Sequence, residues 1–216
     1  MPISDSSIIA GHLSKLEKIY VEDKKIPKDW EKEREYLKII LSSILPVLPI
    51  NYHLIEPKFV GGTSVICVLE NENLKFQCAL KFPRPIKNKI DDFRKVINKE
   101  ISLLTEVRHP NIVALYYQGH IIFNEIDELE PKFQNQKFPD TDDNEDRKKL
   151  PFYIMEYIEG SDNGKQFFRN NLTISEENLV KIVEHTAKGI EHLHKKNIVH
   201  LDIKLENILI QKNPVF

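Results

Sequence analysis

Cysteine and glycine are scarce in this chain of 216 residues, which contains 2 of the first and 7 of the second. Both cysteines, Cys67 and Cys78, lie in apolar, strand-like segments and not in a spaced framework, so we expect them to be reduced and the protein to be cytoplasmic. The low glycine count, together with a hydrophobic content of 41%, excludes a collagen-like or low-complexity chain. We therefore expect a globular protein.

Three further absences exclude classes of partner and of targeting segment. The formal net charge is only −2, so no general excess of positive charge attracts nucleic acid or an anionic membrane surface. The most apolar segment, residues 39–50, is short and is interrupted by Pro46 and Pro49. Residues 1–11 lack a basic region followed by an apolar stretch. We therefore predict no nucleic-acid partner, no membrane-spanning helix and no signal peptide.

Residues 29–45 have the spacing of an amphipathic helix. Their apolar side chains fall three and four positions apart, charged residues crowd the first turns, and Pro46 ends the pattern. Such an apolar stripe requires a partner surface, which is either the rest of this chain or another protein. We assign residues 1–50 to an N-terminal helical extension.

Beyond residue 50 the chain changes to short segments that are rich in β-branched and aromatic residues and are separated by turn compositions. This pattern predicts three consecutive antiparallel strands. Helical spacing then returns, and another strand-like segment follows it. The predicted order is β-β-β-α-β, with strands at residues 53–60, 65–69 and 76–82, a helix at 91–107 and a strand at 112–117.

Residues 120–150 interrupt this regular alternation. Acidic side chains outnumber basic ones there and apolar content is low, so we predict a solvated loop inserted between two strands. A strand-like segment at residues 152–157 follows the insertion. Further along, Ser175 precedes two glutamates, which predicts the N-cap of a helix that extends to Leu193.

The segment with the most specific chemistry runs from residue 198 to residue 210. Its Asp-x-Lys-x-x-Asn core is bracketed by strand-forming aliphatic residues, which predicts a loop held between two short buried strands. Phosphoryl transfer needs a carboxylate to orient an attacking hydroxyl, an ammonium group to neutralise the γ-phosphate and an amide oxygen to ligate magnesium. Asp202, Lys204 and Asn207 provide these groups in that order.

This segment resembles the catalytic loop of the eukaryotic-type Ser/Thr protein kinases, which reads His-Arg-Asp-Leu-Lys-x-x-Asn. The lysine two places after the aspartate is similar to the Ser/Thr class. Leu201 stands where the family usually has arginine, and Leu205 where proline is common. Because that arginine is the usual partner of a phosphorylated activation loop, we do not expect activation by such phosphorylation here.

Upstream segments resemble the same family in the same order. Residues 78–81, Cys-Ala-Leu-Lys, are similar to the third-strand motif, which implies that Lys81 contacts the α- and β-phosphates. Glu100 stands 19 residues later, where the family places the glutamate that pairs with this lysine. Residues 108–113 resemble the turn that follows the glutamate's helix.

The remaining nucleotide-binding features are implied by the resemblance. Residues 153–160 look like the hinge, with Met155 as gatekeeper. The glycine loop at residues 59–66 matches the family pattern only at its second glycine and its final aliphatic residue, and an ordinary hairpin turn is the competing interpretation. The implied nucleotide contacts are Gly61 and Gly62 to phosphate, Ile66, Ala79 and Leu209 around adenine, the backbones of Glu156 and Ile158 at the hinge, and Asp162 at the ribose.

The resemblance implies an α+β, protein-kinase-like fold with a complete β-rich N-lobe and the first part of a helical C-lobe. It also implies ATP and Mg²⁺ as cofactors and a protein substrate phosphorylated on serine or threonine. The domains expected are the extension at residues 1–50, the N-lobe and hinge at 51–158, and the start of the C-lobe at 159–216.

The family places an Asp-Phe-Gly motif shortly after the strand that follows Asn207, and this sequence reaches Phe216 before one appears. We therefore expect a truncated catalytic domain. One alternative is a non-catalytic, kinase-like ATP-binding scaffold that holds a protein partner at the N-terminal helix or the acidic insertion. A small-molecule phosphotransferase is another, although Lys204 argues against it because such enzymes typically lack that lysine.

Overall fold

The structure is a computed structural model that describes residues 10–15, 18, 30–49, 51–84, 89–122, 149–171 and 173–211. The chain divides into two compact units, one formed by residues 1–101 with 116–155 and the other by residues 102–115 with 156–216. The greater part of the predicted acidic insertion, residues 123–148, lies outside the described residues. No helix among the residues described is long and apolar enough to cross a membrane.

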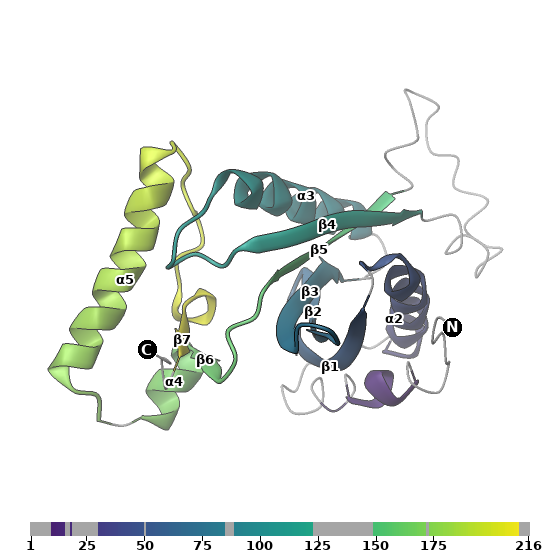
Figure 1. Ribbon diagram of the computed structural model, residues 1–216, viewed down its shortest axis with the longest axis horizontal. Coiled ribbons are helices and arrows are strands. Elements are labelled where there is room, and N and C mark those ends of the chain that lie inside the picture. The colour runs from purple at the N-terminus through teal and green to yellow at the C-terminus, as the bar shows by residue number, and fades with distance from the viewer. Residues whose placement is uncertain are drawn as a thin grey trace. The chain divides into compact units, whose positions relative to one another are not determined.

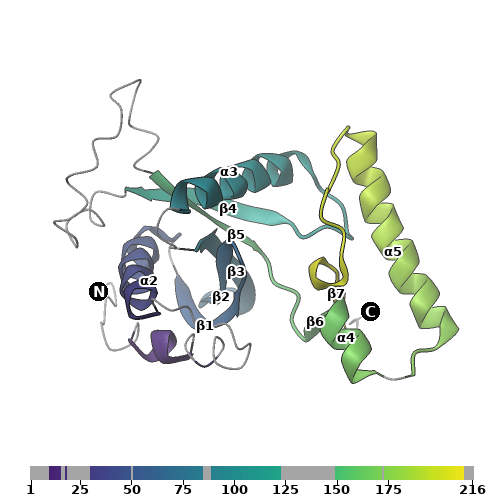
Figure 2. The same ribbon diagram turned by 180° about the vertical axis from the view of Figure 1, so that it is seen from behind.

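The first unit is built on a five-stranded sheet, shown from two sides in Figure 1 and Figure 2. Strand β2 pairs antiparallel with both β1 and β3, so the three consecutive antiparallel strands predicted from the sequence are confirmed. The order across the sheet is β1-β2-β3-β5-β4. The strands are β1 Tyr52–Val60, β2 Ser64–Asn71, β3 Phe76–Pro83, β4 Leu115–Ile122 and β5 Lys149–Glu156.

Successive side chains along these strands point to opposite faces of the sheet. One face carries the residues of the hydrophobic core, and helix α2 (Trp30–Ile44) packs its apolar stripe into the same cluster. The stripe predicted from the sequence is therefore satisfied within this chain. The fully buried members of the cluster include Leu37, Ile40, Leu41 and Ile44 from α2, Cys67 and Leu69 from β2, and Cys78, Leu80 and Phe82 from β3.

Helix α3 (Ile90–Glu106) runs along β4 and β5 (Figure 1). Its bounds and those of α2 agree within one residue with the predicted helices. A short 3-10 helix, η1 (Leu45–Val47), follows α2 and contains Pro46. Proline fits the first turn of a new helix, but it has no backbone N–H to donate in the interior of an α-helix.

The prediction of a strand at residues 112–117 was wrong in its bounds. Ile112 donates its backbone N–H to the carbonyl of His109 at 3.0 Å, so a turn occupies this stretch and delays β4 until Leu115. At the other end β4 continues to Ile122, and β5 begins at Lys149. Both ends of the predicted 120–150 loop are therefore strand.

The second unit contains two helices and a two-stranded sheet. The side chain of Ser175 accepts from the backbone N–H of Asn178 at 3.3 Å, which confirms the predicted N-cap. Gly164 allows a close approach, since a Cβ there would lie 2.8 Å from the carbonyl oxygen of Leu205. The elements are β6 Ser161–Asn163, α4 Gly164–Asn170, α5 Glu176–Lys195, the 3-10 helix η6 Leu205–Asn207 and β7 Leu209–Gln211.

The expectation of two buried strands around the Asp-x-Lys-x-x-Asn segment was wrong. A strand, β7, follows the segment and pairs antiparallel with β6, but the described residues between α5 and η6 contain none before it. The aliphatic residues are also exposed, with 62% of Val199 and 48% of Leu209 accessible. β-branched composition alone did not distinguish an extended, unpaired segment from a paired strand.

Candidate functional site

Lys81 and Glu100 form an ion pair in the first unit. The Nζ of Lys81, on β3, donates to both carboxylate oxygens of Glu100, on α3, at 2.7 and 2.8 Å. The side chains are 16% and 35% exposed, so the pair is shielded from solvent on most sides. The resemblance to the kinases implied this pairing, and the structure brings the two side chains together. A fixed ammonium group on a rigid strand is suited to holding a phosphate.

Tyr153 is a third member of this cluster and was not predicted. Its ring on β5 is fully buried, and the Nζ of Lys81 lies 5.8 Å from the ring centroid. Burial, followed by the negative charge of Glu100, raises the pKa of the Tyr153 hydroxyl. The sequence contains only a weak indication of this contact, which is a tyrosine within the apolar, strand-like segment at residues 152–157.

The glycine loop is a tight turn that joins β1 to β2. The N–H of Gly61 donates to the carbonyl of Ser64 at 2.8 Å, and the carbonyl of Thr63 accepts from the backbone N–H of Arg84 at 2.8 Å. A Cβ built on Gly62 would meet nothing within 4 Å, so packing does not require glycine at that position. The turn is therefore held by its backbone and leaves space beside Gly62.

Ile66 and Ala79 lie on the same face of the sheet as Lys81. The register pairs Ile66 with Lys81 and Val68 with Ala79, and residues directly opposite each other in an antiparallel pair share a face. The two side chains predicted to lie against adenine and the lysine predicted to bind phosphate are therefore neighbours. They point away from the core cluster that α2 covers.

The Asp-x-Lys-x-x-Asn segment in the second unit forms one hydrogen-bonded group. The Nδ2 of Asn207 donates to the backbone carbonyl of Asp202 at 2.8 Å and to its Oδ2 at 2.9 Å. The Nζ of Lys204 lies 2.8 Å from the same Oδ2. His200 Nδ1 accepts from the backbone N–H of Asp202 at 3.3 Å. The three predicted residues are thus brought together around one carboxylate.

These contacts change the ionisation of both charged groups. The hydrogen bond from Lys204, and then that from Asn207, lowers the pKa of Asp202 below its usual value. The hydrogen bond to Asp202 in turn raises the pKa of Lys204. Asp202 is therefore a carboxylate, and Lys204 an ammonium group, throughout the neutral pH range.

The hinge residues show which backbone groups are engaged. The N–H of Glu156 donates to the carbonyl of Ala114 at 2.8 Å, and the carbonyl of Ile158 accepts from the N–H and the hydroxyl of Ser161 at 3.2 and 2.7 Å. The contacts expected between adenine and the backbones of Glu156 and Ile158 stay a prediction.

Asp162 and Leu209 belong to the two-stranded sheet of the second unit. Asp162 on β6 pairs with Ile210 on β7, and Leu209 pairs with Asn163. Leu209 is 48% exposed, while Asp162 is half-buried. The predicted site is thus divided between the two units: Gly61, Gly62, Ile66, Ala79, Lys81 and Glu100 belong to the first, and Glu156, Ile158, Asp162, Asp202, Lys204, Asn207 and Leu209 to the second.

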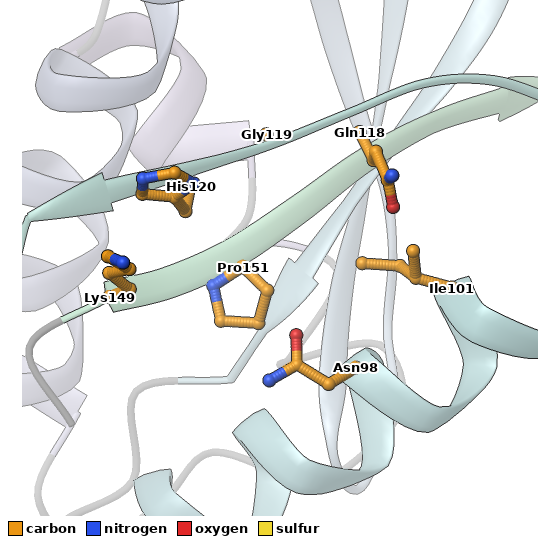
Figure 3. Close-up of a pocket in the computed structure, with 7 residues that line it drawn as sticks. All are labelled: Asn98, Ile101, Gln118, Gly119, His120, Lys149 and Pro151. Carbon is orange, nitrogen blue, oxygen red and sulfur yellow. The ribbon is translucent and has the colours of Figure 1, made fainter. Parts of the chain in front are cut away.

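A separate cavity of about 440 Å³ lies in the first unit between α3, β4 and β5 (Figure 3). Its lining is mostly polar and includes an amide, an imidazole and an ammonium group. None of the residues predicted to bind nucleotide lines this cavity, and no sequence motif indicated it. The lining residues are Asn98, Ile101, Gln118, Gly119, His120, Lys149 and Pro151.

Comparison with known proteins agrees with the geometry. The family model of the protein kinase domain matches residues 60–216. The chain belongs to the protein kinase domain family. This confirms the resemblance read from the catalytic loop, the Lys81–Glu100 pair and the hinge, and it confirms the α+β kinase-like fold. Helix α2 lies outside the matched residues.

Kinases of several organisms are similar to this chain at low identity. The mouse protein "Serine/threonine-protein kinase DCLK3" is 28% identical over 154 residues, which is 71% of this chain and 16% of that protein. "Serine/threonine-protein kinase cds1" of Schizosaccharomyces pombe is 32% identical over 116 residues, 54% of this chain and 19% of that protein. "Mitogen-activated protein kinase 1" of rice is 28% identical over 169 residues, which is 78% of this chain and 34% of that protein. The chain therefore spans about a third or less of the length of these relatives.

Proposed function

We propose that this chain is a protein kinase that transfers the γ-phosphate of ATP to serine or threonine hydroxyls of protein substrates. The observation that carries the proposal is the hydrogen-bonded group of Asp202, Lys204 and Asn207, because it combines the carboxylate, ammonium and amide that phosphoryl transfer requires. Two of the similar proteins are named serine/threonine-protein kinases, which supports the Ser/Thr class. Lys204, two residues after Asp202, supports the same class.

Lys81 and Glu100 are assigned to positioning of the nucleotide. The carboxylate of Glu100 binds Lys81 Nζ with both oxygens, which fixes the direction of the ammonium group. An ammonium group fixed in this way can bind the α- and β-phosphates with little loss of side-chain freedom. The space beside Gly62 supports a close approach of phosphate to the backbone of the turn.

Asp202 is assigned the orientation of the attacking hydroxyl. Its pKa is held below the usual value, so it is ionised at neutral pH and is a weak base. A weak base supports a mechanism in which the carboxylate aligns the hydroxyl first and accepts its proton late, as the bond to phosphorus forms. Lys204 is assigned to the γ-phosphate, where its raised pKa keeps it positively charged.

The kinase family implies a divalent metal in addition to ATP, and we assign Mg²⁺ to Asn207. Its Nδ2 donates to Asp202, so the amide oxygen Oδ1 is the atom that would ligate a metal. An amide oxygen beside a carboxylate is a hard-oxygen donor set of the kind that Mg²⁺ prefers. When bound, the metal would neutralise charge on the phosphates, while the chain's own residues align the hydroxyl.

Two substitutions in the protein test the assignment, each with a matched control. Lys81→Met and Asp202→Asn should each abolish transfer of labelled phosphate to a generic protein substrate. Lys99→Met and Asp92→Asn remove the same side chains from exposed positions of α3 and should leave transfer unchanged. Transfer that persists in both Lys81→Met and Asp202→Asn contradicts the proposed function.

A nucleotide titration separates catalysis from binding alone. If the wild-type chain binds an ATP analogue and Lys81→Met weakens that binding, but no labelled phosphate reaches protein, the non-catalytic ATP-binding scaffold is the correct function. If phosphate reaches a small hydroxyl compound and not protein, the chain is a small-molecule phosphotransferase. Phosphoserine or phosphothreonine in the protein substrate supports the proposal.

A further inference from the structure

A buried ion pair connects helix α2 to the end of strand β3. The guanidinium of Arg84 donates through Nε and Nη2 to the two carboxylate oxygens of Glu33 at 2.6 and 3.1 Å. The side chains are 11% and 5% exposed. This is a bidentate geometry, in which two parallel hydrogen bonds fix the plane of the guanidinium. Glu33 therefore determines where Arg84 points.

The same guanidinium binds the glycine turn. Nη1 of Arg84 donates to the carbonyl of Gly61 at 3.2 Å, and the backbone N–H of Arg84 donates to the carbonyl of Thr63 at 2.8 Å. Arg84 thus contacts both sides of Gly62 and carries two of the turn's tertiary hydrogen bonds. It stands three residues after Lys81 and directly follows β3, the strand whose Lys81 is assigned to phosphate binding.

Helix α2 carries Glu33 on the same face as its apolar stripe, because Glu33 stands four and seven positions before Leu37 and Ile40. Its apolar stripe is fully buried in the core cluster, so the helix cannot shift without disturbing β2 and β3. Because α2 lies outside the residues that match the kinase family model, this connection is a feature of the chain itself and not of the matched domain.

We propose that Arg84 is a positioning residue, held by Glu33 of α2, that fixes the glycine turn at residues 61–63 in the geometry that binds nucleotide phosphate. The N-terminal helix is then a working part of the nucleotide site. This inference rests on the proposed function for its nucleotide, and on the hydrogen bonds of Arg84 for the anchoring of the turn.

Two variants of the whole chain separate anchoring from stability. Arg84→Lys keeps the charge opposite Glu33, but one ammonium group lacks the fork that reaches Gly61 at the same time. The double variant Glu33→Leu with Arg84→Met removes both buried charges together, which is commonly neutral or stabilising, and it also removes the side-chain bond to Gly61. Neither variant leaves a buried charge without a partner, so both are expected to fold.

Two measurements are made on each variant. Hydrogen exchange of the backbone amides at residues 61–64 should become about tenfold faster, because the turn loses a charge-assisted hydrogen bond. The dissociation constant of an ATP analogue should rise by about the same factor. The matched control Ile40→Val loosens the packing of α2 while leaving Arg84 and Glu33 intact, and it should lower the unfolding midpoint without changing either quantity.

The outcomes are distinct. Faster exchange together with weaker nucleotide binding supports the inference, and unchanged exchange in both variants overturns it. If exchange becomes faster while nucleotide affinity stays the same, the turn is anchored by Arg84 but its geometry does not serve binding, which also overturns the inference. If the wild-type chain binds no nucleotide, the proposed function fails, and faster exchange then supports only the anchoring of the turn by Arg84.

Discussion

The ring of Tyr153 lies beside the ammonium group of Lys81, with 5.8 Å between Nζ and the ring centroid. Tyr153 is fully buried, and its hydroxyl is close enough to Glu100 for that carboxylate to contribute to its raised pKa. One side of the Lys81–Glu100 pair is therefore covered by an aromatic ring that excludes water. Exclusion of water strengthens the attraction between the two charges.

Replacement of Tyr153 tests whether the ring or the hydroxyl matters. Tyr153→Leu removes the ring from a fully buried position and should lower the free energy of unfolding by about 2–4 kcal/mol, while also weakening nucleotide binding. Tyr153→Phe keeps the ring and should cost about 1 kcal/mol or less. Urea unfolding and titration with an ATP analogue measure both effects. Equal losses in the two variants would show that the hydroxyl, and not the ring, supports the pair.

A second prediction concerns backbone strain at Leu201, which has φ of 61° and is 82% exposed. The left-handed region costs an L-residue about 1–2 kcal/mol, and exposure means that little packing compensates for it. Leu201→Gly removes this strain at an entropic cost of about 0.5–1 kcal/mol, so the free energy of unfolding should rise by about 0.5–1 kcal/mol.

The matched control for Leu201 is Ile203→Gly, two residues along the same segment. Ile203 is also exposed, at 52%, and is not among the described residues with positive φ. Glycine there should destabilise by about 0.5–1 kcal/mol, since it relieves no strain. Chemical denaturation followed by a probe in the second unit gives both values. Destabilisation of similar size by both substitutions would refute strain at Leu201.

The sequence predicted the parts of the site that are defined by spacing along one chain. The separation of Lys81 from Glu100 places one on a strand and the other on the following helix, and the structure joins them at 2.7 Å. Asp202, Lys204 and Asn207 were predicted because six consecutive residues of one segment contain all three. In this segment a short sequence distance restricts the geometry enough to bring the side chains together, whereas the Lys81–Glu100 pair was implied by the resemblance to the kinases.

Contacts between distant segments could not be predicted in this way. Glu33 and Arg84 are 51 residues apart, and nothing in the composition around either one identifies its partner. The exposure of Val199 could not be predicted either. An extended segment rich in aliphatic residues has the same composition whether or not it pairs with another strand. The bounds of α2 and α3 were predicted within one residue because their apolar period is long and regular, whereas α5 extends two residues beyond the predicted Leu193.

A third prediction concerns Gly119 on β4, where a Cβ would lie 2.6 Å from Cζ of Phe152. Phe152 is fully buried and its ring cannot move aside, so Gly119→Ala should lower the free energy of unfolding by about 1–3 kcal/mol. Gly62→Ala is the control, because a Cβ there meets nothing within 4 Å, and it should stay within about 0.5 kcal/mol of wild type. Thermal or urea unfolding of the two variants measures both losses. A larger loss of stability in Gly62→Ala than in Gly119→Ala would contradict the close packing of Gly119 against Phe152.

The last prediction concerns the pH dependence of stability. Burial raises the pKa of the Cys67 and Cys78 thiols from 9.0 to about 12. In the unfolded chain both thiols ionise above pH 9, whereas in the folded chain they stay protonated. The contribution of each thiol is thus fully present below pH 9 and is lost as the pH rises toward 12, by about 1.4 kcal/mol per pH unit.

Replacing both thiols isolates this effect. The double variant Cys67→Ala with Cys78→Ala should be less stable than wild type at neutral pH, because it leaves small cavities in the core cluster. Its free energy of unfolding should nevertheless fall less steeply between pH 9 and 10.5, so the two stability curves converge as the pH rises. Urea unfolding at steps of half a pH unit measures both slopes. Parallel curves would mean that the thiols are accessible to hydroxide in the folded chain, and a thiol reagent would then label both cysteines without denaturant.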